Sequence, residues 1–88
     1  MDGTTSRLLL LDGNELNLFL LTDLVQELGA TAIVAESGKQ ALELCGDHSF
    51  SAIVTAMDLP DMSAYQLLNR LQADAKTAEI PVVFLLPS

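Results

Sequence analysis

Short apolar runs alternate with segments of helical periodicity along the chain, and this alternation restricts the possible fold more than any other feature. Each run is unbroken and rich in apolar or β-branched residues, as expected of a strand buried on both faces. Between the runs, apolar residues recur every three or four positions, which is typical of helices packed on one side. The pattern predicts strands over 8–11, 31–35, 52–55 and 82–86 and helices over 14–28, 40–45 and 63–71.

This order of elements, βαβαβαβ, predicts an α/β fold with a parallel sheet and right-handed crossovers. With 88 residues the chain supports one small core, so we expect a single domain over 7–88 and a disordered polar leader over 1–6. Ligands of parallel sheets bind at the carboxyl ends of the strands. We therefore expect any functional site in the turn at Asp12, the loop 56–62 and the segment 86–88.

The charge of the chain argues against two classes of partner. Twelve acidic residues against four basic ones give a formal charge of -8, which repels nucleic acids and anionic membrane surfaces. The single cysteine, Cys45, cannot form an internal disulfide, and the apolar run at 7–11 is too short for a signal-peptide core or a membrane span. We expect a cytoplasmic protein that binds neither nucleic acid nor membrane.

Four motifs occupy fixed places in the predicted order of elements. At 8–17 the sequence reads Leu-Leu-Leu-Leu-Asp-Gly-Asn-Glu-Leu-Asn, and at 35–43 it reads Ala-Glu-Ser-Gly-Lys-Gln-Ala-Leu-Glu. At 57–64 it reads Met-Asp-Leu-Pro-Asp-Met-Ser-Ala, and at 80–85 it reads Ile-Pro-Val-Val-Phe-Leu. These motifs resemble those of the receiver domain of bacterial two-component response regulators. The resemblance implies a flavodoxin-like (CheY-like) three-layer sandwich with strand order 2-1-3-4, truncated here after the fourth strand.

The resemblance also implies a phosphorylation site, and this chain departs from it at most positions. In the family, two acidic residues after the first strand hold Mg²⁺ together with an aspartate that ends the third strand and attacks a phosphohistidine. The motif places the nucleophile at Ala56, the direct metal-binding acid at Gly13 and the hydroxyl that senses the phosphoryl group at Leu86. Of the two acidic residues that the family has after its first strand, this chain keeps only Asp12. We therefore expect no enzyme activity, no metal site, and weak or absent Mg²⁺ binding.

Two alternatives stay open at this point. Asp58 and Asp61 follow the nucleophile position closely, so either could act as a displaced phosphoacceptor, although the family uses the backbone carbonyl at the Asp58 position as a metal ligand. A small α/β enzyme or nucleotide binder is the other alternative. It lacks support because the sequence has neither a phosphate-binding glycine-rich loop nor a set of residues for nucleophilic catalysis.

The helix predicted at 14–28 carries more apolar residues than one packed face needs, so it is either core on several sides or an exposed contact patch at Leu18 and Phe19. In the family this helix docks kinase or phosphotransfer helices. The last strand would be an apolar edge, with Val82 and Phe84 as interface candidates, and such edges pair with other chains. The chain could be a fragment, swap elements or dimerise.

Together these features predict a degenerate, non-phosphorylatable receiver domain that acts as a protein-interaction and dimerisation module. The expected partner is a kinase, a phosphotransfer domain, an output domain or a second copy, with a homodimer predicted for the isolated chain.

Overall fold

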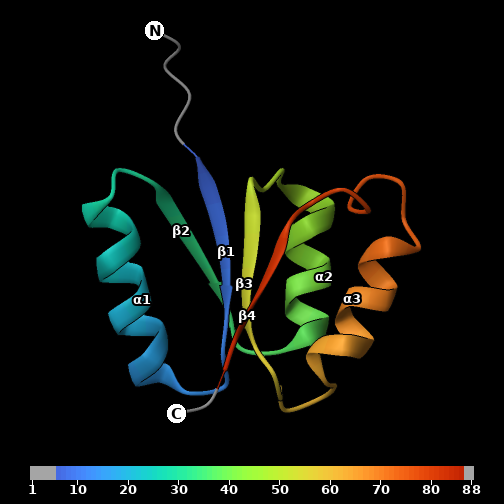
Figure 1. Ribbon diagram of the computed structural model, residues 1–88, viewed down its shortest axis with the longest axis horizontal. Coiled ribbons are helices and arrows are strands. Elements are labelled where there is room, and N and C mark those ends of the chain that lie inside the picture. Colours follow the sequence, from blue (N-terminus) through green and yellow to red (C-terminus); the bar gives the residue numbers. More distant parts are fainter. Residues whose placement is uncertain (1–5, 87–88) are drawn as a thin grey trace, which may run out of the picture.

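The computed structural model describes residues 6–86 and has four parallel strands and three helices (Figure 1). The strands lie in the order β2-β1-β3-β4, so the predicted topology is confirmed. The register pairs Leu9 with Ile33 on one side and with Ile53 on the other, and Val54 with Val83. The elements are β1 (Arg7–Leu11), α1 (Glu15–Glu27), β2 (Thr31–Ala35), α2 (Gly38–Asp47), β3 (Ala52–Ala56), α3 (Ala64–Gln72) and β4 (Val82–Leu85).

The sheet is the middle of three layers, with α1 on one face and α2 and α3 on the other (Figure 1). Because successive side chains of a strand point to opposite faces, β1 supplies both cores. Leu9 and Leu11 pack with Ile53 in the core under α2 and α3. Leu10 packs with Val25 in the smaller core under α1. This explains why the strand sequences read as unbroken apolar runs.

Polar residues cap α1 and α3 where the sequence predicts their starts, whereas α2 begins at Gly38, two residues before its predicted start, with Ser37 as its cap. Asn14 caps α1, because its side chain accepts hydrogen bonds from the amides of Leu16 and Asn17. Ser63 caps α3 in a capping box with Gln66. The predicted stop of the first helix is also confirmed, since Gly29 follows it with a φ of 87°, a conformation that favours glycine.

Ser6 is the one residue of the predicted leader that the structure describes. The predicted leader 1–6 lies outside the described residues except for Ser6, whose carbonyl accepts a hydrogen bond of 2.8 Å from the Thr31 amide. Ser6 thus precedes β1 and is hydrogen-bonded to the start of β2. Within residues 6–86, no helix is long and apolar enough to cross a membrane.

Leu18 does not belong to the predicted exposed contact patch on α1. Its side chain is 5% exposed and packs with Leu10 and Val25, so it is a core residue, whereas its neighbour Phe19 is 69% exposed. The reason is the helical period, because residues one step apart on a helix lie about 100° apart around its axis. Only Phe19 can belong to an exposed patch.

The predicted apolar edge exists, but its exposed side chains are not the predicted ones. Val82 packs against the core under α2 and α3, and the ring of Phe84 lies 5.7 Å from that of Tyr65 on α3. Val83 is half-exposed and lies with Leu85 on the face of β4 opposite Val82 and Phe84. Val82 and Phe84 are therefore half-buried, and their role in an interface stays a prediction.

Candidate functional site

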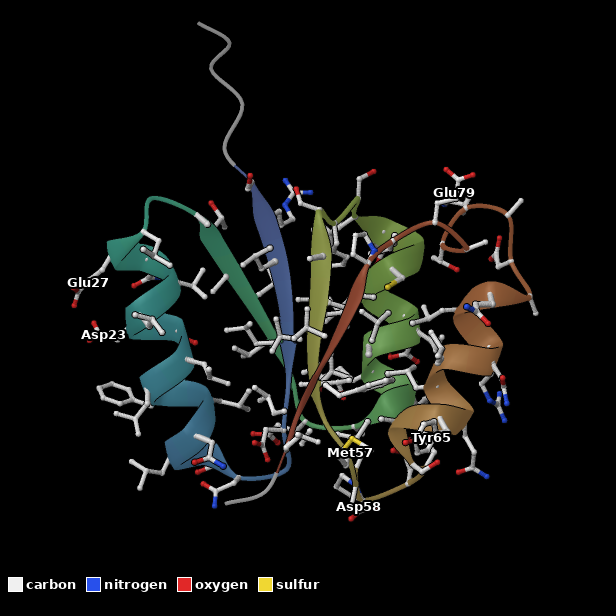
Figure 2. The ribbon with its side chains drawn as sticks, viewed as in Figure 1. Asp23, Glu27, Met57, Asp58, Tyr65 and Glu79 are labelled. Carbon is white, nitrogen blue, oxygen red and sulfur yellow. The ribbon has the colours of Figure 1, made fainter. Side chains whose placement is uncertain are left out.

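A cleft of about 500 Å³ lies at the carboxyl ends of β1, β3 and β4. Figure 2 shows Met57 and Asp58 at this end of the sheet, just beyond β3. Parallel strands deliver their carboxyl ends to the same edge, which is why loops far apart in sequence converge here. The residues that line the cleft are Asp12, Asn17, Leu20, Leu21, Ala56, Met57, Asp58, Leu85 and Leu86. The structure thus brings together Asp12 and the predicted positions at 56, 58 and 86.

Asp12 is the most buried acidic residue at the cleft, with 9% of its surface exposed. One carboxylate oxygen accepts a hydrogen bond of 3.0 Å from the Asn14 amide, and the other accepts one of 3.1 Å from the Asn17 side-chain nitrogen. Both bonds hold the turn that starts α1. Asn17 is not among the predicted site residues, although its place one turn into a capped helix is a usable signal.

Ala56 ends β3 and is half-buried, with its methyl group among the cleft residues and its backbone paired with Leu85. Gly13 lies beside the cleft, where an added Cβ would stand 3.5 Å from the Pro60 ring, an ordinary van der Waals contact. Position 13 therefore has room for a larger side chain.

The two candidate acceptors in the loop after β3 are in different environments. The Asp61 carboxylate accepts hydrogen bonds from the amides of Gly38 (2.8 Å) and Lys39 (2.9 Å), so it caps the first turn of α2. These bonds are the main reason that the pKa of Asp61 lies below its ordinary value. Asp61 is occupied as a helix cap, and only Asp58 lines the cleft.

The cleft offers two carboxylates, those of Asp12 and Asp58, as oxygen ligands for a cation. Mg²⁺ takes oxygen ligands in near-octahedral geometry, usually with carboxylates among them. Both oxygens of the Asp12 carboxylate already accept hydrogen bonds that hold the turn before α1. Asp58 also lines the cleft. Across 6–86, no group of three or more acidic, histidine or cysteine residues is arranged to hold a metal ion.

Comparisons with known proteins agree with this architecture. The response regulator receiver domain family matches residues 8–86. The virulence sensor protein BvgS of Bordetella pertussis (strain Tohama I) is 37% identical over 67 residues, which are 76% of this chain and 5% of that protein. The polar-differentiation response regulator DivK of Brucella ovis is 32% identical over 79 residues, which are 90% of this chain and 64% of that protein. The chain thus spans less than two thirds of either relative.

Solved structures share the fold at lower sequence identity. A sensor protein from Polaromonas sp. JS666 superimposes with a TM-score of 0.91 at 22% identity, covering 97% of this chain and 68% of that one. The receiver domain of the sensor histidine kinase PA1611 from Pseudomonas aeruginosa PAO1 has a magnesium ion coordinated in its active site cleft. It superimposes with a TM-score of 0.86 at 20% identity, covering 92% of this chain and 66% of that one. On its sequence and its fold, the chain belongs to the response regulator receiver domain family of two-component systems.

Proposed function

We propose that this chain is a receiver domain that takes no phosphoryl group at the usual position and works by binding other proteins. One observation carries the proposal: Ala56 stands at the carboxyl end of β3, in the wall of the cleft. An alanine methyl has neither an oxygen to attack phosphorus nor a charge to hold a metal. On this proposal the chain is not an enzyme.

The surroundings of Ala56 support the same proposal. A phosphoryl group carries negative charge in the transition state of its transfer, and a bound cation or a basic side chain must balance that charge. The acids left at the cleft are Asp12, which is tied into the α1 turn, and Asp58. We expect Mg²⁺ affinity to be weaker than millimolar, and titration calorimetry measures it directly.

Intact-mass spectrometry after incubation with acetyl phosphate and Mg²⁺ tests the proposal. The chain should keep its mass. The double variant Gly13→Asp with Ala56→Asp places a carboxylate at position 13, which has room for a Cβ, and one at position 56 in the cleft wall, and it should gain Mg²⁺ affinity and one phosphoryl group. The matched control carries asparagine at the same two positions and should gain neither. Phosphorylation of the unaltered chain would contradict the proposal.

Asp58 supports a second candidate function, a phosphoacceptor displaced by two positions. Its side chain is exposed at the cleft, so a small phosphodonor could reach it. Asp61 is a weaker candidate, because its oxygens accept the Gly38 and Lys39 amides. If the unaltered chain gains a phosphoryl group that Asp58→Asn abolishes and Asp61→Asn leaves in place, Asp58 is the acceptor.

We also propose that the isolated chain forms a homodimer through the β4 side of the molecule. β4 ends the sheet, and Val83 is 50% exposed there. Leu20 of α1 is 56% exposed and lines the cleft together with Leu85 of β4. Exposed apolar side chains along an edge strand are typical of contact sites. Light scattering at micromolar concentration should give a dimer for the chain and a monomer for Val83→Asp, whereas a stable monomer of the unaltered chain would refute the dimer.

A kinase, a phosphotransfer domain or an output domain remains the proposed partner class beyond self-association. The proposed compartment is the cytoplasm, which suits a chain whose single cysteine, Cys45, is a buried free thiol. The charge of -8 supports the absence of nucleic acid and of anionic membranes among the partners.

A further inference from the structure

β2 is an edge strand with one open side. Figure 1 shows it beside α1, at the end of the sheet opposite β4, and within residues 6–86 it pairs with β1 alone. Edge strands commonly carry charged residues or proline, which prevent pairing with another chain. The five residues of β2, Thr-Ala-Ile-Val-Ala, include neither. This edge therefore lacks the usual protection against strand pairing.

The hydrogen bonds at the two ends of β2 show which backbone groups face the open edge. At its start, the Thr31 amide donates to the Ser6 carbonyl over 2.8 Å. At its end, the Ala35 carbonyl accepts a hydrogen bond of 3.3 Å from the residue that follows β1. Successive residues of a strand direct their amides and carbonyls to opposite sides. The amides and carbonyls of Ala32 and Val34 therefore face outward, where they have no strand partner in the described part of the chain.

This open row is two residues long because its ends are occupied. Before it, the Ala30 amide donates to the Val25 carbonyl over 3.2 Å. After it, the Glu36 amide donates to the side-chain oxygen of Gln40 over 2.9 Å. An antiparallel strand added here would form two hydrogen-bonded pairs, with two bonds each. The free backbone groups therefore fix the register of any such strand.

A hollow of about 260 Å³ lies between α1 and β2, beside the open edge. Val34 and Phe19 line it and are 40% and 69% exposed. The charged residues that line it are Glu15 and Glu36, both of which are exposed. None of the four basic residues of the chain lies on α1 or β2. The hollow thus offers an apolar contact next to negative charge.

We infer that the open edge of β2 binds an extended segment of another protein, which adds an antiparallel strand to the sheet. The residue opposite Val34 exchanges two backbone hydrogen bonds with it and carries a large apolar side chain that enters the hollow beside Phe19. The residue two positions earlier lies opposite Glu36 on the same face and is lysine or arginine. Backbone hydrogen bonds supply the affinity, and these two side chains supply the specificity.

A second copy of this chain fits the edge poorly. Two β2 strands paired with each other offer no basic side chain to Glu36, and both copies carry the charge of -8. The inference deepens the proposed function, since it gives an interaction module a site and a partner chemistry.

Binding of synthetic peptides tests the inference. The probe is a short fluorescent peptide with lysine, leucine and valine at alternate positions, in that order from its amino end, and threonine between them. One control peptide is N-methylated at the leucine and valine amides, which face β2 in an antiparallel pair, and the other at the threonine amides, which face solvent. In fluorescence anisotropy, the first methylation should weaken binding at least about tenfold, and the second should leave it within about threefold.

Amide hydrogen exchange followed by NMR locates the added strand. In the free chain, the amides of Ala32 and Val34 should exchange faster than that of Ile33, which faces β1. Saturating peptide should slow exchange at Ala32 and Val34. It should leave the Phe84 amide unchanged, because that amide lies at the other edge of the sheet.

Matched variants of the chain give a second readout. Val34→Pro removes an outward amide without removing a bond to β1, and proline is tolerated on the free side of edge strands. It should weaken peptide binding at least about tenfold, while Val34→Thr, which keeps the amide, should stay within about threefold. Glu36→Gln should weaken binding several-fold, whereas Glu43→Gln, the same charge change at an exposed acid of α2, should not.

Several results would overturn the inference. It fails if the two methylated peptides bind alike, if exchange slows at Phe84 and not at Val34, or if Val34→Pro binds the probe as the unaltered chain does. It also fails if Glu43→Gln weakens binding as much as Glu36→Gln. Conversion of a dimer to a monomer by Val34→Pro would make a second copy the occupant and overturn it as well. Phosphorylation of the chain would refute the proposed function without affecting these titrations.

Discussion

Replacing Leu18 and Phe19 by alanine one at a time separates a core side chain from its exposed neighbour. Leu18 is 5% exposed and packs with Leu10 and Val25, so Leu18→Ala removes apolar contacts and leaves a cavity. Leucine-to-alanine changes in cores cost about 2 to 5 kcal/mol. Because the core under α1 is small and its helix can shift inward, we expect about 3 kcal/mol. Phe19→Ala should cost less than about 1 kcal/mol, since the ring is 69% exposed.

The loss at Leu18 is large for a domain of this size. A chain of 88 residues has a free energy of unfolding of roughly 4 to 13 kcal/mol, so about 3 kcal/mol is a substantial fraction. Urea titration followed by circular dichroism measures it, and the midpoint should fall by about 2 M if the slope is about 1.5 kcal/mol per molar. The reasoning is refuted if Leu18→Ala and Phe19→Ala shift the midpoint equally, or if Phe19→Ala shifts it more.

Three further predictions concern α2 and its surroundings. The pKa of Asp61 is lowered in the folded chain, so its hydrogen bonds to the α2 amides stabilise the fold above the ordinary aspartate pKa of about 4. This stabilisation is lost as the pH falls through the lower pKa of the folded state. In urea titrations, the difference in unfolding free energy between the unaltered chain and Asp61→Asn should therefore shrink from pH 7 to pH 3. Gly46→Ala should raise the free energy of unfolding by about 0.5 to 1 kcal/mol, because a Cβ at position 46 meets nothing within 4 Å. In the same titration, Gly38→Ala should lower the free energy of unfolding, because a Cβ at position 38 would overlap the Met62 side chain. Burial raises the pKa of Cys45, so iodoacetamide should alkylate it slowly in the native chain and rapidly in urea, and equal rates would contradict its place in the core.

The order and type of the elements could be predicted because they depend on local periodicity. The run 8–11 has no polar position, and a strand with both faces covered by helices needs none. The strand order 2-1-3-4 came from the resemblance of the motifs and not from periodicity. The place of the site was also predictable, since parallel strands bring Asp12, Ala56 and Leu86 to one edge whatever their side chains are.

The roles of individual side chains were harder to predict, because they depend on phase and on partners distant in sequence. The amino-acid pattern made the first helix apolar on several sides, but only packing against β1 decided that Leu18 is buried and Phe19 is exposed. Along β4 the same phase separates Val82, which faces α2 and α3, from the half-exposed Val83. An error of one position exchanges a core residue for a surface residue.

By itself the sequence determined that this chain forms a parallel α/β receiver fold, and it predicted Ala56 at the position of the family's phosphorylated aspartate. Tertiary structure alone decided that Asp61 caps α2, because its amide partners lie more than 20 residues away in sequence. It also decided that Phe19 and Val34, from a helix and a strand, share one acidic hollow. Periodicity is a local property that a sequence displays directly, whereas these contacts exist only after the crossovers bring distant segments together.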